Sequence, residues 1–201
     1  MEIFNKSTNI LHKNKPASKP YSEILLNKAH LYSKYWSYLP FVKEVYVCNS
    51  VAIGNAHSNS DIDLLIISQK NSMFLARLFW MLFFYMSFQR SFFSIKFGRI
   101  CPSFWIDGDF DLIDSVSNEV DPYISIWKKN LISIKSYPNK SYSSFLKFIN
   151  FTIGKLMLFR ITSSKKFKKA PEGAVVVNFR VLKLHFNDKR KAFLNSLVDS
   201  R

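Results

Sequence analysis

The segment of residues 44–67, EVYVCNSVAIGNAHSNSDIDLLII, constrains the fold more than any other part of the chain. Its two ends, residues 44–48 and 61–67, are rich in β-branched and aromatic side chains, which predicts two buried strands. Between them lie a turn, a short helix and a loop in which Gly54 and Asn55 break regular structure. Together with helical segments elsewhere, this pattern predicts an α/β (α+β) fold in which helices pack on a small mixed sheet.

Apolar residues recur at helical spacing in several other segments. They predict helices over residues 21–38, 73–88, 143–161 and 188–198, and another that begins at Asp121-Pro122. Ser22 and Ser72 stand where helix N-caps are expected. The segment 73–88 is very apolar, but Arg77 interrupts it and a membrane span needs about 20 residues. We therefore expect a buried helix there and no membrane span.

Further strand material lies in residues 99–113, where RICPSFWI and DFDLI are joined at Gly108. Residues 175–177 fit either a short strand or an extended tail. These patterns predict three regions. Residues 1–20 form a flexible N-terminal arm, residues 21–130 form the core domain, and residues 131–201 form a C-terminal helical extension with a basic tail.

Asp61 and Asp63 open the second strand of the 44–67 segment. Side chains alternate along a strand, so both carboxylates point to one face while Ile62 points into the core. Two such charges a few Å apart repel by roughly 1–4 kcal/mol, depending on the local dielectric. A strand that keeps both predicts a bound cation, and hard cations such as Mg²⁺ or Mn²⁺ prefer carboxylate, phosphate and water oxygens.

The first strand ends in a turn at Asn49-Ser50, which we expect to offer backbone N–H groups and a hydroxyl to a phosphate opposite the metal. Metal carboxylates facing a phosphate-binding turn form the layout of phosphoryl transfer, where positioning and charge neutralisation supply most of the catalysis.

These residues resemble the nucleotidyltransferase fold of the DNA polymerase β superfamily, of the minimal nucleotidyltransferase kind. The signature is an apolar strand, Gly-Ser, roughly ten residues and then Asp-x-Asp, and it appears here as Val47-Cys48-Asn49-Ser50 and Asp61-Ile62-Asp63. Blocks such as RICPSFWI and VLKLHFNDKR extend the similarity to an uncharacterised bacterial subgroup. The resemblance implies that Asp61 and Asp63 are catalytic and ligate Mg²⁺. It also implies a nucleotide-binding segment that contains Asn49, Ser50, Gly54 and Ser60.

The chain departs from that family pattern in two ways. Asn49 replaces the Gly of Gly-Ser, although Asn tolerates left-handed backbone angles better than other non-Gly residues. The third carboxylate of the superfamily, a general base or metal ligand on a later strand, is best matched by Asp111. Asp107 and Asp109 are the alternatives, and without one of the three the domain is expected to bind nucleotide without turning it over.

The chain carries 29 Lys and Arg against 14 Asp and Glu, a net charge of +15. This charge suits a polyanionic partner such as nucleic acid, although an A/T-rich coding sequence produces the same composition. Cys48 and Cys101 lie in apolar contexts without a CxxC pattern, which predicts buried free thiols in a reducing compartment. The polar N-terminal segment predicts no signal peptide, so a cytoplasmic protein is expected.

The functional hypothesis is metal-dependent transfer of a nucleoside monophosphate from a nucleoside triphosphate to a hydroxyl acceptor of unknown identity. Asp61 and Asp63 would hold the metals, Ser50 the phosphate, and Asp111 would activate the acceptor. One alternative is a catalytically weak, antitoxin-like interaction module that pairs with a small helical toxin. Another is a basic nucleic-acid-binding protein. Arg99 and Lys96 are further candidates for facing the triphosphate.

Overall fold

The computed structural model describes residues 19–36, 38–86, 98–116, 128–138, 140–170 and 175–184. Most of the expected N-terminal arm, Lys96, the helix expected to begin at Asp121 and the helix expected over residues 188–198 lie outside these ranges.

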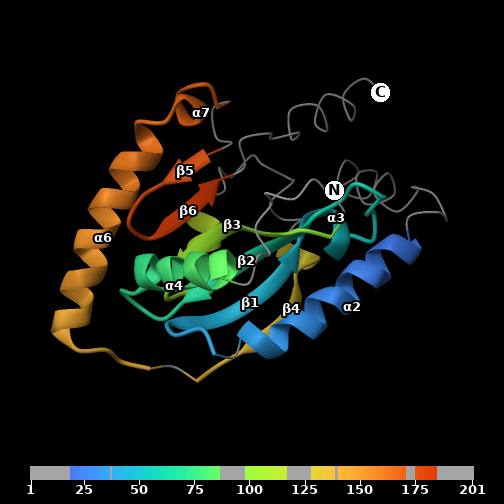
Figure 1. Ribbon diagram of the computed structural model, residues 1–201, viewed down its shortest axis with the longest axis horizontal. Helices are drawn as coiled ribbons and strands as arrows, with labels where there is room; N and C mark the ends of the chain where they lie inside the picture. The colour runs from blue at the N-terminus through green and yellow to red at the C-terminus, as the bar shows by residue number, and fades with distance from the viewer. Residues whose placement is uncertain are drawn as a thin grey trace.

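A mixed sheet of six strands forms the centre of the described structure (Figure 1). The strands are β1 (Val42–Cys48), β2 (Ile62–Ser68), β3 (Ile100–Asp107), β4 (Ile132–Ser136), β5 (Val175–Val177) and β6 (Val181–Leu184). Their order in the sheet is β4-β1-β2-β3-β6-β5. Only β2 and β3 run parallel, and every other neighbouring pair is antiparallel. The predicted mixed sheet is confirmed.

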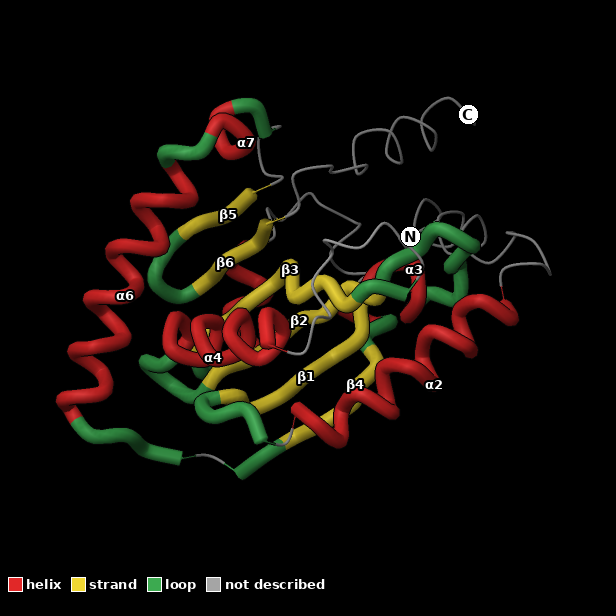
Figure 2. The backbone as a smooth tube through the Cα atoms, in the orientation of Figure 1, coloured by secondary structure: helices red, strands yellow, loops and turns green. Residues whose placement is uncertain are grey.

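Helices cover this sheet mainly on one face (Figure 2). The helical elements are α2 (Lys19–Trp36), α3 (Asn49–Ala52), α4 (Met73–Met86), the 3₁₀ helix η1 (Phe110–Val116), α6 (Ser144–Thr162) and α7 (Lys165–Lys168). One core cluster joins α2, α4 and α6 to the sheet, whereas η1 belongs to a smaller cluster built around Leu65, Ile67 and Ile106. The predicted α/β (α+β) fold class is therefore confirmed.

The sheet draws on more of the chain than residues 21–130. Strands β4, β5 and β6 all come from the region expected to be a helical extension, and β4 pairs directly with β1. Residues 175–177 form a strand, β5, rather than an extended tail. Local periodicity missed this because such short strands are stabilised by partners far away in the sequence.

Residues 73–86 of the apolar segment form α4, in which Trp80 and Phe84 are buried. Trp80 contacts both Trp36 and Trp105, with ring centroids 5.4 and 5.8 Å away. The expected helix is thus present and is buried along the side that carries Trp80 and Phe84, whereas Phe79 and Leu82 are exposed. In the described part of the chain, no helix has the length and hydropathy needed to cross a bilayer.

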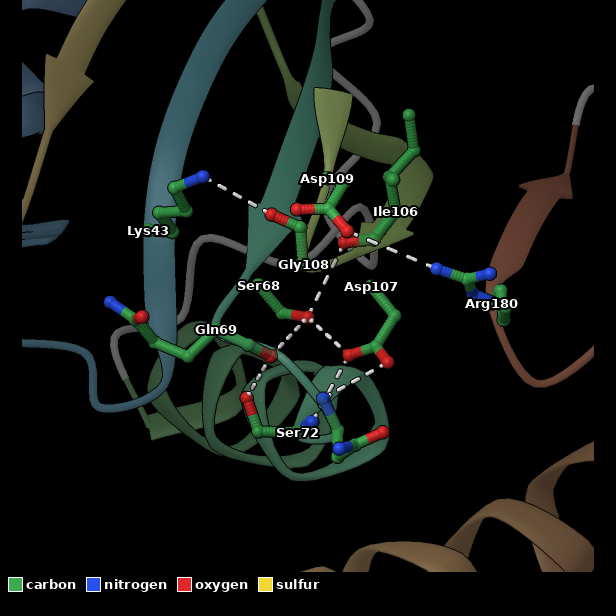
Figure 3. Close-up of polar contacts among 10 residues, drawn as sticks. Lys43, Ser68, Gln69, Ser72, Ile106, Asp107, Gly108, Asp109 and Arg180 are labelled. Carbon is green, nitrogen blue, oxygen red and sulfur yellow. Dashed lines mark hydrogen bonds and ion pairs between the residues drawn. The ribbon is translucent and has the colours of Figure 1, made fainter. Parts of the chain in front are cut away.

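Two distant side chains, rather than Ser72, cap the first turn of α4. Asp107 accepts hydrogen bonds from the backbone N–H groups of Asn71 and Ser72, at 3.0 and 3.1 Å, and from the Ser68 hydroxyl (Figure 3). Burial raises the pKa of the Asp107 carboxyl, while these hydrogen bonds oppose the shift. Since the N-terminus of a helix favours negative charge, Asp107 serves here as a helix cap.

Asn150 of α6 completes the cap. Its side-chain oxygen accepts from the N–H groups of Phe74 and Leu75, at 2.9 and 3.0 Å, and the residue is buried. Four residues later, Gly154 faces Phe74 so closely that an added Cβ would lie 2.6 Å from the phenyl ring. The cap and this close approach fix α6 against α4.

We expect Asn150→Ala to lower the free energy of unfolding by about 1–3 kcal/mol, because two buried N–H groups lose their acceptor. Denaturant unfolding followed by circular dichroism measures the change. Thr152→Ala is the matched control on the exposed side of the same helix, and should stay within about 0.5 kcal/mol of the parent. Equal losses in the two variants would show that the Asn150 cap contributes nothing.

Candidate metal and nucleotide site

The candidate site lies at one edge of the sheet, where three neighbouring strands meet. Cys48, the last residue of β1, pairs with Asp63 of β2, and Asp63 pairs in turn with Cys101 of β3. Because β1 runs antiparallel to β2, its end meets the beginning of β2. The two halves of the sequence pattern around residues 44–67 are thereby brought together.

Asp61 and Asp63 lie on one face, as predicted, and Ile62 between them is fully buried. Ligand atoms of Asp61, Asp63 and Cys101 all lie within 4.8 Å of one another. All three residues are half-buried. Two carboxylate groups at this spacing fit a hard divalent cation, because such a cation both bridges and neutralises them.

Asn49 adopts a left-handed backbone conformation, with φ of 59°. This confirms that Asn sustains the turn in which the family has Gly. Its side-chain amide donates a 2.8 Å hydrogen bond to the Asp63 carboxylate. The amide therefore orients one candidate metal ligand, in addition to allowing the turn.

The other residues of the expected nucleotide-binding segment occupy the loop between β1 and β2. Ser50 is half-buried in the short helix α3, directly after the turn, and its carbonyl accepts from the Asn55 N–H at 2.8 Å. Gly54 has φ of 79° with open space where a side chain would be. Ser60 is buried, and its hydroxyl accepts from the His57 N–H at 2.9 Å, closing the turn before Asp61.

None of the three expected candidates for the third carboxylate comes to this edge of the sheet. Asp107 pairs with Ser68, at the opposite end of β2 from Asp63. Asp107 lies six positions after Cys101 along β3, a distance of about 20 Å. Asp109 lies within 3.9 Å of Arg180, and Asp111 is exposed on η1.

The expectation for Asp111 is therefore corrected by two features of the fold. The DFDLI segment forms a 3₁₀ helix rather than a strand. In addition, β3 runs parallel to β2, so its beginning, not its end, lies beside Asp63. Strand β3 thus places Cys101 beside Asp61 and Asp63, and it places Asp107 beside the N-terminal end of α4.

Cys101 is the site residue that the sequence pattern did not single out as a ligand. Burial raises the pKa of its thiol to about 12, and the charges of Asp63 and Asp61 add to this effect. The thiol therefore stays protonated at neutral pH and hydrogen-bonds to the Asp63 side chain. A neutral thiol is a poor ligand for a hard cation, so the donor set that fits Mg²⁺ is the carboxylate pair.

Arg99 precedes β3 and places a guanidinium nitrogen 3.7 Å from the Asp61 carboxylate. Beside this pair, a cavity of about 280 Å³ opens between α4 and the first half of β3, lined in part by Arg77, Met81 and Cys101. Cationic groups thus border the carboxylates on the β3 side. Lys96, the other basic candidate, lies outside the described residues.

Comparison with protein families assigns the part of the chain that contains this site. Residues 32–97 match the model of the nucleotidyltransferase domain, a range that includes β1, α3, β2 and α4. Comparison with curated proteins and with solved structures gives no match. The matched range, the six-stranded mixed sheet and the aspartate pair agree with one another, and together they support a nucleotidyltransferase-type fold around this site.

Proposed function

We propose that this protein binds a nucleoside triphosphate through a divalent cation, Mg²⁺ or Mn²⁺, held by Asp61 and Asp63. It then transfers the nucleoside monophosphate to a hydroxyl acceptor. The observation that carries this proposal is the convergence of the two carboxylates at the sheet edge, directly beside the turn at Asn49 and Ser50.

Each residue at that edge of the sheet has a separate role in the proposed reaction. Asp61 and Asp63 bind the cation, and the Asn49 amide holds the Asp63 carboxylate in place. Ser50 lies on the β1 side of the pair and contacts the phosphates. Arg99 borders the other side and adds positive charge near Asp61. A bound cation would neutralise phosphate charge and make the α-phosphorus a better electrophile.

The reaction forms one bond and breaks one. The acceptor oxygen bonds to the α-phosphorus, the bond between the α-phosphorus and the bridging oxygen breaks, and pyrophosphate leaves. The hydroxyl proton passes to solvent. In-line displacement needs the acceptor opposite the leaving group, so phosphates at Ser50 would place the acceptor toward β3.

A second candidate is a nucleotide-binding module with little turnover, such as an antitoxin-like partner. Cys101 favours this candidate, because a thiol rather than a carboxylate stands on the strand next to Asp63, where a third carboxylate would complete the site. Asp107, Asp109 and Asp111 all lie at the other end of β3 and cannot replace it there.

Incubation with α-³²P-labelled nucleoside triphosphates and Mg²⁺ separates the two candidates. Transfer labels an acceptor and releases pyrophosphate in equal amounts, whereas a binding module retains label only as intact triphosphate on a filter. Aminoglycosides, protein hydroxyls and nucleic-acid ends are the acceptor classes to supply. If neither labelled product nor metal-dependent retention is found, the proposal is wrong.

A further inference from the structure

Four large apolar side chains lie exposed along the outer side of α6. Phe145, Phe148, Leu156 and Phe159 are 70%, 67%, 67% and 73% exposed. Their spacing of three and eleven residues places them on one side of the helix, which we call the outer face of α6. Figure 1 shows α6 along one edge of the described structure, and this face lies on the side of the helix opposite Asn150 and Gly154, which contact α4.

The opposite side of α6 is locked in place, so the helix cannot roll to bury its outer face. Asn150 is held there by two hydrogen bonds to α4, and Gly154 packs against Phe74 and Phe179. Exposed apolar side chains gathered in one patch usually mark a binding surface. The outer face of α6 therefore needs a partner with an apolar layer.

Positive charge borders the outer face. At 3.6 residues per turn, Lys155 and Arg160 flank the face on α6, and α7 adds Lys165, Lys166 and Lys168 directly after the helix. Between residues 131 and 170 the sequence has no Asp or Glu. A second copy of the chain docked through this face would set cation against cation, which disfavours a symmetric dimer.

We propose that the outer face of α6 lies against an anionic lipid surface. Phe and Leu side chains would enter the boundary between headgroups and acyl chains, and the flanking Lys and Arg would remain among the negative headgroups. A helix whose exposed face has apolar residues along its middle and cations along its borders is typical of such peripheral membrane contact. The 19-residue α6 would lie along the surface and would not cross it.

Co-sedimentation with vesicles tests this inference on the full chain. The two vesicle types are pure phosphatidylcholine and an equimolar mixture of phosphatidylcholine and phosphatidylglycerol. We expect binding to the anionic vesicles, little binding to the neutral ones, and weakening with added salt. Phe148→Asp/Phe159→Asp should reduce binding at least about tenfold, because it removes apolar insertion and adds repulsion.

Leu31→Asp is the matched control, since Leu31 is 57% exposed on α2, away from α6. It should bind anionic vesicles as the parent does, and melting curves should show that both variants fold. Equal binding by the Phe variant would reduce the interaction to adsorption of a basic protein and overturn the proposal. Absence of vesicle binding by the parent protein would overturn the proposal as well. So would a parent protein that is dimeric in solution and becomes monomeric only in Phe148→Asp/Phe159→Asp.

Discussion

Replacing both aspartates, as Asp61→Asn/Asp63→Asn, is expected to weaken Mg²⁺-dependent triphosphate binding at least about 100-fold. The reason is that the two carboxylates are the proposed hard-cation ligands at this edge of the sheet. Titration calorimetry of a nucleoside triphosphate, with Mg²⁺ and then with excess chelator, measures the effect. The parent should bind only with the metal present, and the double variant should bind weakly under both conditions.

Asp111→Asn is the control for this experiment. Asp111 is exposed on η1, beyond the end of β3 that lies farthest from Asp63, so its loss should leave the affinity unchanged. A loss as large as that of the double variant would contradict the placement of β3. Equal triphosphate binding by the parent with and without Mg²⁺ would contradict the metal site itself.

The part of this site that could be predicted from the sequence is the part that is local. Asp61 and Asp63 are two residues apart on a strand, and alternation alone places them on one face. The left-handed turn at Asn49 was likewise predictable, because Asn is one of the few residues that accept positive φ. The hydrogen bond from Asn49 to Asp63 was not, since it depends on how β1 and β2 pair.

The residue at the third carboxylate position depends on long-range strand pairing, and here the local sequence pattern gave a wrong prediction. The alternation in DFDLI is compatible with a strand, but Gly108, with φ of 85°, ends β3 and the next residues form η1. Whether β3 ran parallel or antiparallel to β2 decided which of its ends met Asp63. No local signal distinguishes the two arrangements, so Cys101 could be identified only from the fold.

The support of α4 was unpredictable for the same reason. Sequence proximity favoured Ser72 as the cap, whereas the acceptors come from Asp107 on β3 and Asn150 on α6. An aspartate read as a candidate for the catalytic centre therefore serves the fold. A buried carboxylate with several backbone donors is as consistent with a helix cap as with a catalytic group, and position alone separates them.

If the position of Cys101 is what limits turnover, Cys101→Asp should raise the rate of nucleotidyl transfer. The change sets a third carboxylate on the strand beside Asp63, where it can accept the acceptor's proton or bind a metal. A positioned general base contributes about 10²–10⁴-fold, so an increase of at least about tenfold is expected. Pyrophosphate release in the presence of an acceptor is the measurement, at saturating triphosphate and Mg²⁺.

The same variant should also make stability depend on the metal. Three carboxylates within a few Å repel one another by roughly 1–4 kcal/mol per close pair at intermediate dielectric, so the metal-free protein should melt at a lower temperature. Mg²⁺ should restore much of that loss, because it binds only the folded site. Cys101→Ser, which adds no charge, should change neither the transfer rate nor the response to Mg²⁺. If Cys101→Asp behaves like Cys101→Ser in both measurements, position 101 does not face the reacting groups, and the thiol is not what separates this site from an active one.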